Sequence, residues 1–543
     1  MCARPSLRQS TIRSLACSVV ALVAALVVSP ATAAESGKRG GTLRLYVLDN
    51  PPSASLHEES TIGSVTPFAS VFNNLVRFDP LKVHESLDTI IPDLAESWQW
   101  DPTNTKLTFK LRQGVKWHDG KPFTAKDVQC TWRMLIGKSE VADFRRNPRR
   151  VWYNKVQDVS INGDYEATFE LSEPQPSLPA LLASALSPVY PCHVPQNVMR
   201  TRPVGTGPFK FVEFRRGDSI RLVRNPDYWR KDRPYLDEIT FKIVENRSTR
   251  MLAFSTGEFD ITFPSDVSVP LFNDIKARTP QAVCEMVPTG TMATLMVNRV
   301  NPPFDNADIR TALSLVIDRN ALNTILMEGK ALIGGAMLPK PVGEWGMPRE
   351  MLEQLTGYGS DIAKNVARAR ELMQKHGFSE ANPLKLKVQT RNLVTYRDPA
   401  VIVIDQLKKI FVEGELEIID SPQWYARMAR KDYTLALNVM GVSVDDPDGN
   451  IVENYSCGSE RNYTQYCNAD VDKLLAAQSR EMDREKRKRL VWDIERLLVE
   501  DTARPVIQFS VAGNCWHSYV KNYVPHDNSQ YNYVRYDDVW LDK

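Results

Sequence analysis

The chain has 543 residues, of which 43% are hydrophobic and 25% are charged. This composition is too apolar for an intrinsically disordered protein, and the length is sufficient for more than one hydrophobic core. Glycine and proline together make up about 11% of the residues, which excludes a low-complexity or collagen-like sequence.

The N-terminus has the pattern of a cleavable secretory signal peptide. Three arginines are the only charged residues before an apolar stretch at 15–28, and a small-x-small site follows at 31–33. About 14 apolar residues are too few to span a bilayer comfortably, which disfavours the alternative of a membrane anchor. We therefore predict a signal peptide over residues 1–33 and a periplasmic location. Cys17 precedes the apolar stretch, so we expect no lipid on it.

Removal of residues 1–33 takes away three arginines and no acid, so the formal charge falls from +2 to −1. A nearly neutral chain gives no reason to expect a nucleic-acid partner. Six cysteines remain, too few for a disulfide scaffold, and we expect one or two local disulfides among them. They are Cys130, Cys192, Cys284, Cys457, Cys467 and Cys515.

Strand patterns dominate the first half of the chain. Alternating apolar residues occur at 42–47 and 107–111. Asn162-Gly163 separates two further alternating runs, at 156–161 and 165–171, which is typical of a hairpin with a two-residue turn.

Helical patterns alternate with strand patterns in the second half. A helix is predicted over 308–327 and another over 361–376, each followed by a glycine at its C-terminal end. Alternation of helices and strands predicts an α/β fold. Further helices are expected at 398–411, 423–430, 471–482 and 484–500, and strands at 384–390, 415–419 and 435–440.

The sequence lacks the common signatures of catalytic and metal sites. It has no His-Glu-x-x-His, no Cys-x-x-Cys pair, no phosphate loop and no Gly-x-Ser-x-Gly. The string Gly205-Thr206-Gly207 lacks the third glycine of a dinucleotide site. We therefore predict no catalytic residue, no metal ion and no cofactor.

Two specific strings carry a resemblance to a known family. They are LRQGVKWHDGKPFTAKDV at 111–128, and GTGPFKF at 205–211 with RNPDYW at 224–229. Together with PFD at 303–305 and DPD at 446–448, they resemble the family 5 extracellular solute-binding proteins of ABC importers, the dipeptide-, oligopeptide- and nickel-binding class.

The resemblance implies a two-lobed periplasmic binding protein fold of type II, similar to cluster C, with an extra subdomain in lobe I. By similarity, lobe I spans 34–287, with the extra subdomain at about 76–203. Lobe II spans 288–508, and residues 509–543 return to lobe I. The two crossings between lobes are expected near 287–290 and 508–511.

The resemblance also implies a function. Such a protein captures a peptide or peptide-like solute between its lobes by hinge closure and delivers it to the permease subunits of an ABC transporter in the inner membrane. We expect it to act as a monomer. Other solutes, such as an opine, an oligosaccharide or a metal chelate, remain open as alternatives, and an extracytoplasmic enzyme is disfavoured because catalytic motifs are missing.

The ligand loop departs from the dipeptide-binding relatives. In those relatives an Asp three residues ahead of the Asp-Pro-Asp unit binds the ligand's amine, and a Trp lies six ahead; here these positions hold Ser443 and Met440. Asp445 and Asp446 can supply a negative charge to the ligand if the loop follows a different path. A β-turn is the alternative for the string around them.

Three further residues are candidates for ligand contact. Arg391 ends a predicted strand, close to where dipeptide binders hold a carboxylate, and its guanidinium can form two parallel hydrogen bonds to such a group. Arg397 is the local competitor, and a surface salt bridge is the alternative for both. Asn50 follows the first strand, and Trp424, with Tyr425 next to it, begins a helix; each can line the pocket, although an aromatic at helical spacing is more often in a core.

Cys457 and Cys467 flank a polar, turn-rich segment. Relatives often carry a disulfide just after the Asp-Pro-Asp unit, so the resemblance favours a bond between these two cysteines over two buried thiols. Cys192 with Cys515 is the weaker second pair.

Overall fold

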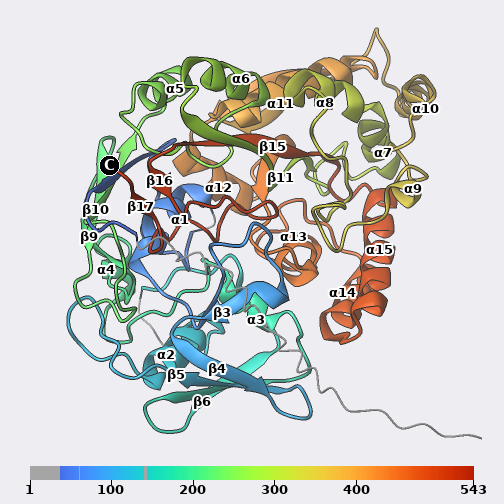
Figure 1. Cartoon of the computed structure of the whole chain (residues 1–543). Helices are drawn as coiled ribbons and strands as arrows, with labels where there is room; N and C mark the ends of the chain where they lie inside the picture. The colour runs from blue at the N-terminus through green and yellow to red at the C-terminus, as the bar shows by residue number, and fades with distance from the viewer. Residues whose placement is uncertain (1–36, 60, 140–142) are drawn as a thin grey trace, which may run out of the picture. The chain divides into compact units, whose positions relative to one another are not determined.

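The computed structural model of the protein describes residues 37–59, 61–139 and 143–543 (Figure 1). The signal peptide predicted at 1–33 lies outside these residues. Strands predominate in the first half, and helices alternate with strands in the second, so the α/β prediction is confirmed. Below, lobe I denotes the part built around the sheet that contains β1, and lobe II the part built around the sheet that contains β12.

The sheet of lobe I has the strand order β1-β10-β9-β8. β1 runs parallel to β10, and β9 is antiparallel to both of its neighbours. Apolar residues at alternate positions, such as Leu43, Leu45 and Ile239, are buried in one core. The elements of this part are β1 (Thr42–Val47), α1 (Ile62–Phe68), β8 (Phe209–Arg215), β9 (Ser219–Arg224), β10 (Glu238–Ile243), α5 (Arg247–Ser255) and α6 (Val269–Arg278).

A second four-stranded sheet, of order β4-β5-β7-β6, lies with α2 at the lower end of the molecule in Figure 1. The predicted hairpin around Asn162-Gly163 is confirmed, since β6 and β7 pair antiparallel and Gly163 has φ 64°. The predicted two-residue turn is wrong, because four residues, 162–165, lie between the two strands. The elements are β2 (Val76–Phe78), β3 (Ile90–Pro92), β4 (Ala95–Trp100), β5 (Lys106–Leu111), α2 (Ala125–Leu135), β6 (Val156–Ile161), β7 (Glu166–Leu171), α3 (Leu178–Ala183) and α4 (Gln196–Met199).

The sheet of lobe II has the order β13-β12-β14-β11-β15, with β12 parallel to both β13 and β14. Most helices between residues 307 and 408 pack with it around a separate apolar core, and the two helices between 469 and 500 belong to a further apolar cluster. The strands are β11 (Ala282–Val297), β12 (Leu384–Arg391), β13 (Val412–Ile419), β14 (Leu435–Gly441) and β15 (Val506–His517). The helices are α7 (Ala307–Val316), α8 (Arg319–Met327), α9 (Arg349–Leu352), α10 (Ile362–Lys375), α11 (Val394–Lys408), α12 (Ser421–Ala429), α13 (Glu453–Tyr455), α14 (Ala469–Arg480) and α15 (Arg484–Glu500).

The prediction of a single helix over 308–327 is wrong. The chain leaves the helical conformation at Ile317, where ψ is 104°, and α8 starts anew after Asp318. The Asp318 side chain accepts a hydrogen bond from the backbone N–H of Ala321, which is the contact that an N-terminal cap makes. The apolar periodicity continues through this break, so it hides the break in the sequence.

β11 and β15 are long antiparallel partners that belong to both halves of the molecule. Their pairing shifts register between Pro288 and Met292. On one side of the shift, β15 bridges to Ile261 and Val267 of lobe I; on the other, β11 pairs with β14 of lobe II. The two segments expected to cross between lobes lie at this shift.

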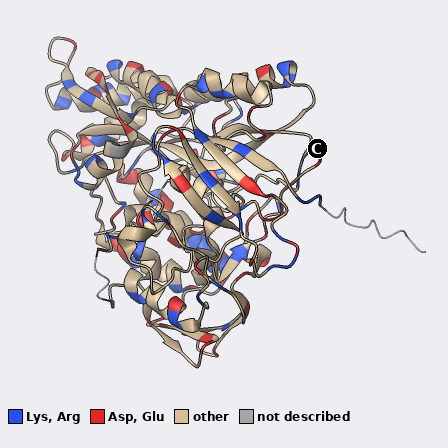
Figure 2. Ribbon diagram, turned by 90° about the vertical axis from the view of Figure 1, so that its left-hand side faces the viewer, with Lys and Arg blue, Asp and Glu red and all other residues tan. Residues whose placement is uncertain are grey.

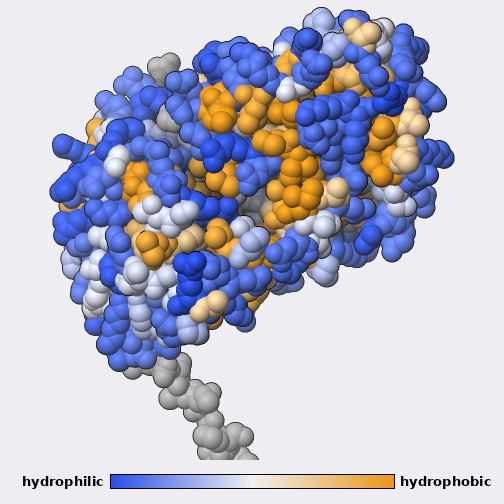
Figure 3. Space-filling view, turned by 90° about the horizontal axis from the view of Figure 1, so that it is seen from above, coloured by the Kyte–Doolittle hydropathy of each residue, from blue (hydrophilic) through white to orange (hydrophobic). Residues whose placement is uncertain are grey.

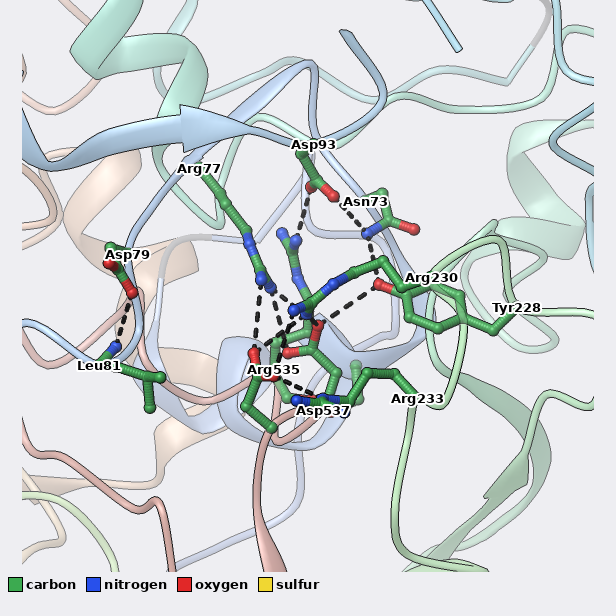
Figure 4. A network of polar contacts seen from close by, with 12 residues as sticks. Asn73, Arg77, Asp79, Leu81, Asp93, Tyr228, Arg230, Arg233, Arg535 and Asp537 are labelled. Atoms are coloured by element: carbon green, nitrogen blue, oxygen red, sulfur yellow. Dashed lines mark hydrogen bonds and ion pairs between the residues drawn. The ribbon is translucent and has the colours of Figure 1, made fainter. Parts of the chain in front are cut away.

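The C-terminal segment after β15 contributes β16 (Val520–Lys521) and β17 (Trp540–Leu541), which pair with each other, and it packs on the core of lobe I. A buried network of charges fastens it there (Figure 4). Arg77 pairs with Asp537 at 2.9 Å, and Arg535 pairs with Asp93 at 2.6 Å. Arg230 also contacts Asp537, so residues from three distant parts of the chain meet in one cluster.

Three disulfides are present among the described residues: Cys130–Cys192, Cys284–Cys515 and Cys457–Cys467. The expectation of one or two local disulfides is therefore wrong, because two of the three bonds link residues 62 and 231 positions apart. The predicted bond between Cys457 and Cys467 is thus present in the structure. The suggested pair Cys192–Cys515 is wrong, because each of these cysteines has another partner. Cys515 instead lies opposite Cys284 in the β11–β15 ladder, a register that the sequence alone does not reveal.

Basic and acidic residues are interspersed along the described chain (Figure 2). On the face shown in Figure 3, hydrophobic residues gather around the middle, and hydrophilic ones cover most of the margin. Within the described part of the chain, no helix combines the length and the apolar character needed to cross a membrane.

Candidate functional site

A cavity lies between the two lobes. Its empty volume is about 1270 Å³, which includes space open to solvent. Lobe I contributes residues that follow β1 and residues near 263–268, and lobe II contributes the ends of β12 and β14 and the start of α11. The β11 and β15 strands form the wall that connects both sides, through Thr291, Ala293, Gln508 and Ser510.

Apolar and aromatic side chains make up much of the lining. Among them are Phe263, Tyr396, Tyr425, Met440 and Tyr531. Gly441 allows one of these contacts, because a Cβ atom at this position would lie only 2.6 Å from Oη of Tyr531. A cavity with apolar walls and a few placed charges is typical of a small-molecule or peptide site.

Asp49 and Arg391 form an ion pair at the cavity, one residue from each lobe. Asp49 follows β1 in lobe I, Arg391 ends β12 in lobe II, and Oδ2 of Asp49 lies 2.6 Å from Nη2 of Arg391. Nε of Arg391 also donates a hydrogen bond to Oγ of Ser421 at 2.6 Å. The rings of Tyr396 and Tyr425 lie 5.6 and 5.7 Å from the guanidinium carbon, within the range of cation–π attraction. Arg391 is thus held rigidly, with its charge compensated by the opposite lobe.

A second arginine, Arg461, lines the cavity from the loop between Cys457 and Cys467. Its Nη1 lies 3.0 Å from Oε1 of Glu453, and both side chains are buried. Burial raises the pKa of Glu453, while the positive charges of Arg461 and Arg149 act in the opposite direction. Arg149, a buried residue of lobe I that does not line the cavity, thus also acts on this pair through its charge.

Two buried amides in the wall have unpartnered oxygens. In the described structure, Oδ1 of Asn438 on β14 and Oε1 of Gln508 on β15 have no hydrogen-bond partner. Both residues line the cavity. Leaving a buried polar atom without a partner costs free energy, so these amides are suited to hydrogen bonding with a bound molecule.

Of the seven ligand-contact residues predicted from the sequence, Arg391 and Met440 lie in the cavity lining. Asn50 lies outside it, and its Oδ1 accepts a hydrogen bond from the backbone N–H of Gly217 at 2.6 Å. Trp424 is fully buried in a small apolar core of lobe II, the alternative that its helical spacing had favoured. In both cases the neighbouring residue, Asp49 or Tyr425, lines the cavity instead.

The polar residues predicted in the loop after β14 do not line the cavity. The carbonyl of Ser443 accepts hydrogen bonds from Ser529 and Asn532, and Ser443 is outside the lining. Asp446 forms two hydrogen bonds with Arg487, at 2.7 and 2.8 Å. A ligand role for Asp446 is therefore not compatible with this arrangement, because its carboxylate is already fully engaged by α15.

Asp445 also points away from the cavity. Its Oδ2 accepts a hydrogen bond from the backbone N–H of Glu344, and its carbonyl accepts one from Nε1 of Trp345. Burial is the main reason that its pKa rises to about 7, and the nearby charges of Asp446 and Glu344 add to the effect. The turn anchors a neighbouring loop instead of facing a ligand.

The sequence analysis missed Asp49, Arg461, Glu453 and Tyr531. Asp49 carried a weak signal, because it directly precedes the candidate Asn50 at the end of the first strand. Arg461 and Glu453 lie in polar segments without any spacing that marks them, and Tyr531 reaches the cavity only through the return of the C-terminal segment to lobe I.

Comparisons with known proteins agree with this architecture. The family model described as "Bacterial extracellular solute-binding proteins, family 5 Middle" matches residues 89–462. The oligopeptide-binding protein AppA of Bacillus subtilis (strain 168) is 27% identical over 482 residues, which cover 81% of this chain and 83% of AppA.

Solved structures share the fold. Haemophilus influenzae OppA in complex with the peptide RPPGFSPFR aligns with a TM-score of 0.83 and 22% identity, covering 93% of this chain and 100% of OppA. The periplasmic binding protein AgaA of A. tumefaciens R10, in complex with agropinic acid, aligns with a TM-score of 0.78 and 21% identity, covering 93% of this chain and 99% of AgaA. The two-lobed fold is thereby confirmed, and the chain belongs to the bacterial extracellular solute-binding proteins of family 5.

Proposed function

We propose that this protein captures a peptide or peptide-like solute between its two lobes by hinge closure and delivers it to the permease subunits of an ABC importer. The observation that carries the proposal is the cavity, whose walls come from both lobes and whose two sides are joined by the Asp49–Arg391 ion pair. The similarity to AppA, an oligopeptide-binding protein, supports a peptide as the solute.

The lobes in this proposal have the bounds expected from the sequence. Lobe I comprises 34–287, with the extra subdomain at about 76–203, and it receives the segment 509–543. Lobe II comprises 288–508. The register shift between Pro288 and Met292 supports a hinge at this position, because irregular pairing allows two connected strands to bend.

Arg391 is the first residue we assign to solute binding. A guanidinium has five N–H donors, and Asp49 and Ser421 accept hydrogen bonds from two of its nitrogens. Donors that remain on the cavity side serve a solute carboxylate or carbonyl group. Met440 contributes apolar contact from β14.

The last part of the proposal concerns the cellular location of the protein. We assign the protein to the periplasm as a monomer, released from a signal peptide at 1–33. N-terminal sequencing of protein from the periplasmic fraction should begin near Ala34, and recovery of Met1 would contradict this part.

Native mass spectrometry of the purified protein tests the main proposal. A protein that closes over its solute should carry a bound mass, which denaturation releases for identification. We expect a peptide or peptide-like molecule. The Arg391→Ala variant should retain less of it, and Arg430→Ala, which changes an exposed arginine of lobe II outside the lining, should retain the wild-type amount.

A non-peptide solute is the second candidate, because Ser443 replaces the amine-binding Asp of the dipeptide-binding relatives and AgaA shares the fold with agropinic acid bound. A released cargo without peptide character would favour this candidate and reject the first.

A further inference from the structure

Three buried arginines cluster beside the cavity with a single carboxylate among them. Arg149, Arg461 and Arg504 are each at least nine-tenths buried, and so is Glu453. In the described structure, Glu453 is the only carboxylate within ion-pair distance of any of the three, through its 3.0 Å contact with Arg461. The cluster therefore carries two positive charges in excess.

The other contacts of these arginines do not compensate their charge. Nη2 of Arg149 donates to the carbonyls of Leu56 and Glu59, at 2.8 and 2.7 Å. Arg504 donates to Oδ1 of Asn454 and to the sulfur of Met296. These acceptors are neutral. In the described structure, the Nε atom of each of the three arginines has no hydrogen-bond partner.

The pKa values separate Arg461, which is paired with Glu453, from the other two arginines. Burial acts to lower the pKa of Arg461, but the charge of Glu453 and the neighbouring tyrosines together outweigh burial and the pKa is raised. Burial lowers the pKa of Arg149 and of Arg504, and the positive charge of Arg461 adds to both effects. A buried charge without a counter-ion is costly, and removing one partner from a buried pair costs several kcal/mol for this reason. A bound anion would relieve this cost.

Arg461 is the member of the cluster that reaches the cavity. It lines the cavity together with Tyr425 and Tyr531, and both tyrosines lie close enough to act on its charge. Tyr425 also stands beside Arg391, with its ring 5.7 Å from that guanidinium. Through Arg461, the cluster therefore borders the same cavity as the Asp49–Arg391 pair.

The described lining offers little to a positively charged group. Its acidic residues are Asp49, which is paired with Arg391, and Asp398, which is exposed at the margin. Ser443, Asp445 and Asp446 all lie outside it. A free ammonium group inside the cavity would have to compete with Arg391 for Asp49.

We propose, on the basis of the proposed function, that the cavity selects a solute with an apolar body and one anionic group, held by Arg461, and that it requires no free ammonium group. Within the peptide class, this describes a peptide with a blocked N-terminus and a free carboxylate. The carboxylate accepts hydrogen bonds from Arg461 and lowers the excess positive charge of the cluster from two to one.

Calorimetry with three forms of one dipeptide tests the inference on the wild-type protein. The probes are Leu-Phe, N-acetyl-Leu-Phe and N-acetyl-Leu-Phe amide. We expect acetylation to leave the affinity within about threefold, and amidation to weaken it by about 10- to 150-fold, the range for a lost hydrogen bond to a charged group. Loss of affinity on acetylation, with none on amidation, would overturn the inference.

Two variants with opposite expected effects separate recognition from stability. Arg461→Gln should abolish the preference for the acid over the amide, and Glu453→Gln, which removes the competing carboxylate, should strengthen acid binding severalfold. Arg430→Gln removes an exposed positive charge of the same lobe and should change neither. A merely structural role would lower thermal stability in both cluster variants without this opposition in affinity.

If the proposed function is wrong, the results differ from those that would overturn the anion site. If none of the three probes binds, the cargo released in native mass spectrometry decides. An anionic non-peptide cargo that Arg461→Gln loses supports the anion site while rejecting the peptide. A cargo without any anionic group overturns the anion site itself.

Discussion

Oδ2 of Asp49 lies 2.6 Å from Nη2 of Arg391, although 342 positions separate the two residues in the chain. One belongs to lobe I and the other to lobe II, and both are largely buried in the cavity wall. The pair therefore links the lobes directly. An ion pair shielded from solvent is screened less by salt than an exposed one, so it can stabilise the closed arrangement.

Substitution of Arg391 should open the protein. Arg391→Ala removes the link between the lobes, so we expect a larger radius of gyration in small-angle X-ray scattering without added solute. Affinity for the identified cargo should fall by about 1.5 to 3 kcal/mol, the range for a hydrogen bond to a charged group. Lysine at this position should recover only part of the loss, because an ammonium group lacks the planar fork.

Arg397→Ala is the matched control, since Arg397 lies on α11 near Arg391 but outside the lining. It should change neither the radius nor the affinity. A double-mutant cycle with Asp49→Asn isolates the pair: additivity within about 0.5 kcal/mol would mean that the two residues do not act together.

Asp445 should make the protein less stable as the pH rises. Burial raises its pKa to about 7, so the folded protein keeps a proton that the unfolded chain has already released. The free energy of unfolding should therefore fall between about pH 4 and pH 7. Asp445→Asn removes the charge and keeps an acceptor for the N–H of Glu344, and it should raise the melting temperature at pH 8 more than at pH 5.

The adjacent Asp446→Asn variant should have the opposite effect. It breaks the paired hydrogen bonds with Arg487 and leaves this buried arginine with Asp448, 3.7 Å away, as its remaining ion-pair partner. We expect a loss of about 3 to 5 kcal/mol, typical of breaking a buried pair. Equal melting temperatures for the two variants at pH 8 would contradict both assignments.

Glu495 should hold the loop between α8 and α9 in place. Its two carboxylate oxygens accept hydrogen bonds from the backbone N–H groups of Met337 and Met347, at 2.8 and 2.6 Å. Glu495→Ala leaves both N–H groups without these acceptors, so we expect faster amide hydrogen exchange at these two positions. The exposed Glu500→Ala, on the same helix, should leave their exchange unchanged.

The disulfides should survive as three separate pairs in peptide mapping without reductant. Selective loss of the Cys457–Cys467 bond by substitution of both cysteines with alanine should cost about 3 kcal/mol in the chain-entropy model for a short loop. Because the loop carries Arg461, the same variant should also weaken solute binding. Recovery of Cys192 linked to Cys515 would contradict the structure.

Much of the fold could be predicted from the sequence, because the strand and turn patterns are local. The hairpin at Asn162-Gly163 and the glycines that follow the helices are signals of this kind. The break at Ile317 could not be predicted, because the apolar residues keep a helical spacing on both sides of it and the pattern does not reveal a single extended residue.

The site was predictable only where a residue stands at the end of a regular element. Arg391 ends β12 and lines the cavity, as expected. Asp445 and Asp446 lie one turn beyond β14, and the path of that turn depends on Arg487 and on the Glu344 loop, which are distant in sequence. The Arg461 cluster depends on the docking of the lobes, which no local pattern encodes.

The charge network of the C-terminal segment bears on the order in which the protein folds. Arg77, Asp93 and Arg230 are synthesised early, but their partners Arg535 and Asp537 are among the last residues of the chain. Nearly the whole polypeptide is made before those residues emerge, and until then these three charges lack the partners that they have in the native protein. Lobe II, whose core residues run from Ala293 to Ile507, requires no such wait. Synthesis from the N-terminus therefore favours the later-encoded lobe as the first to be completed.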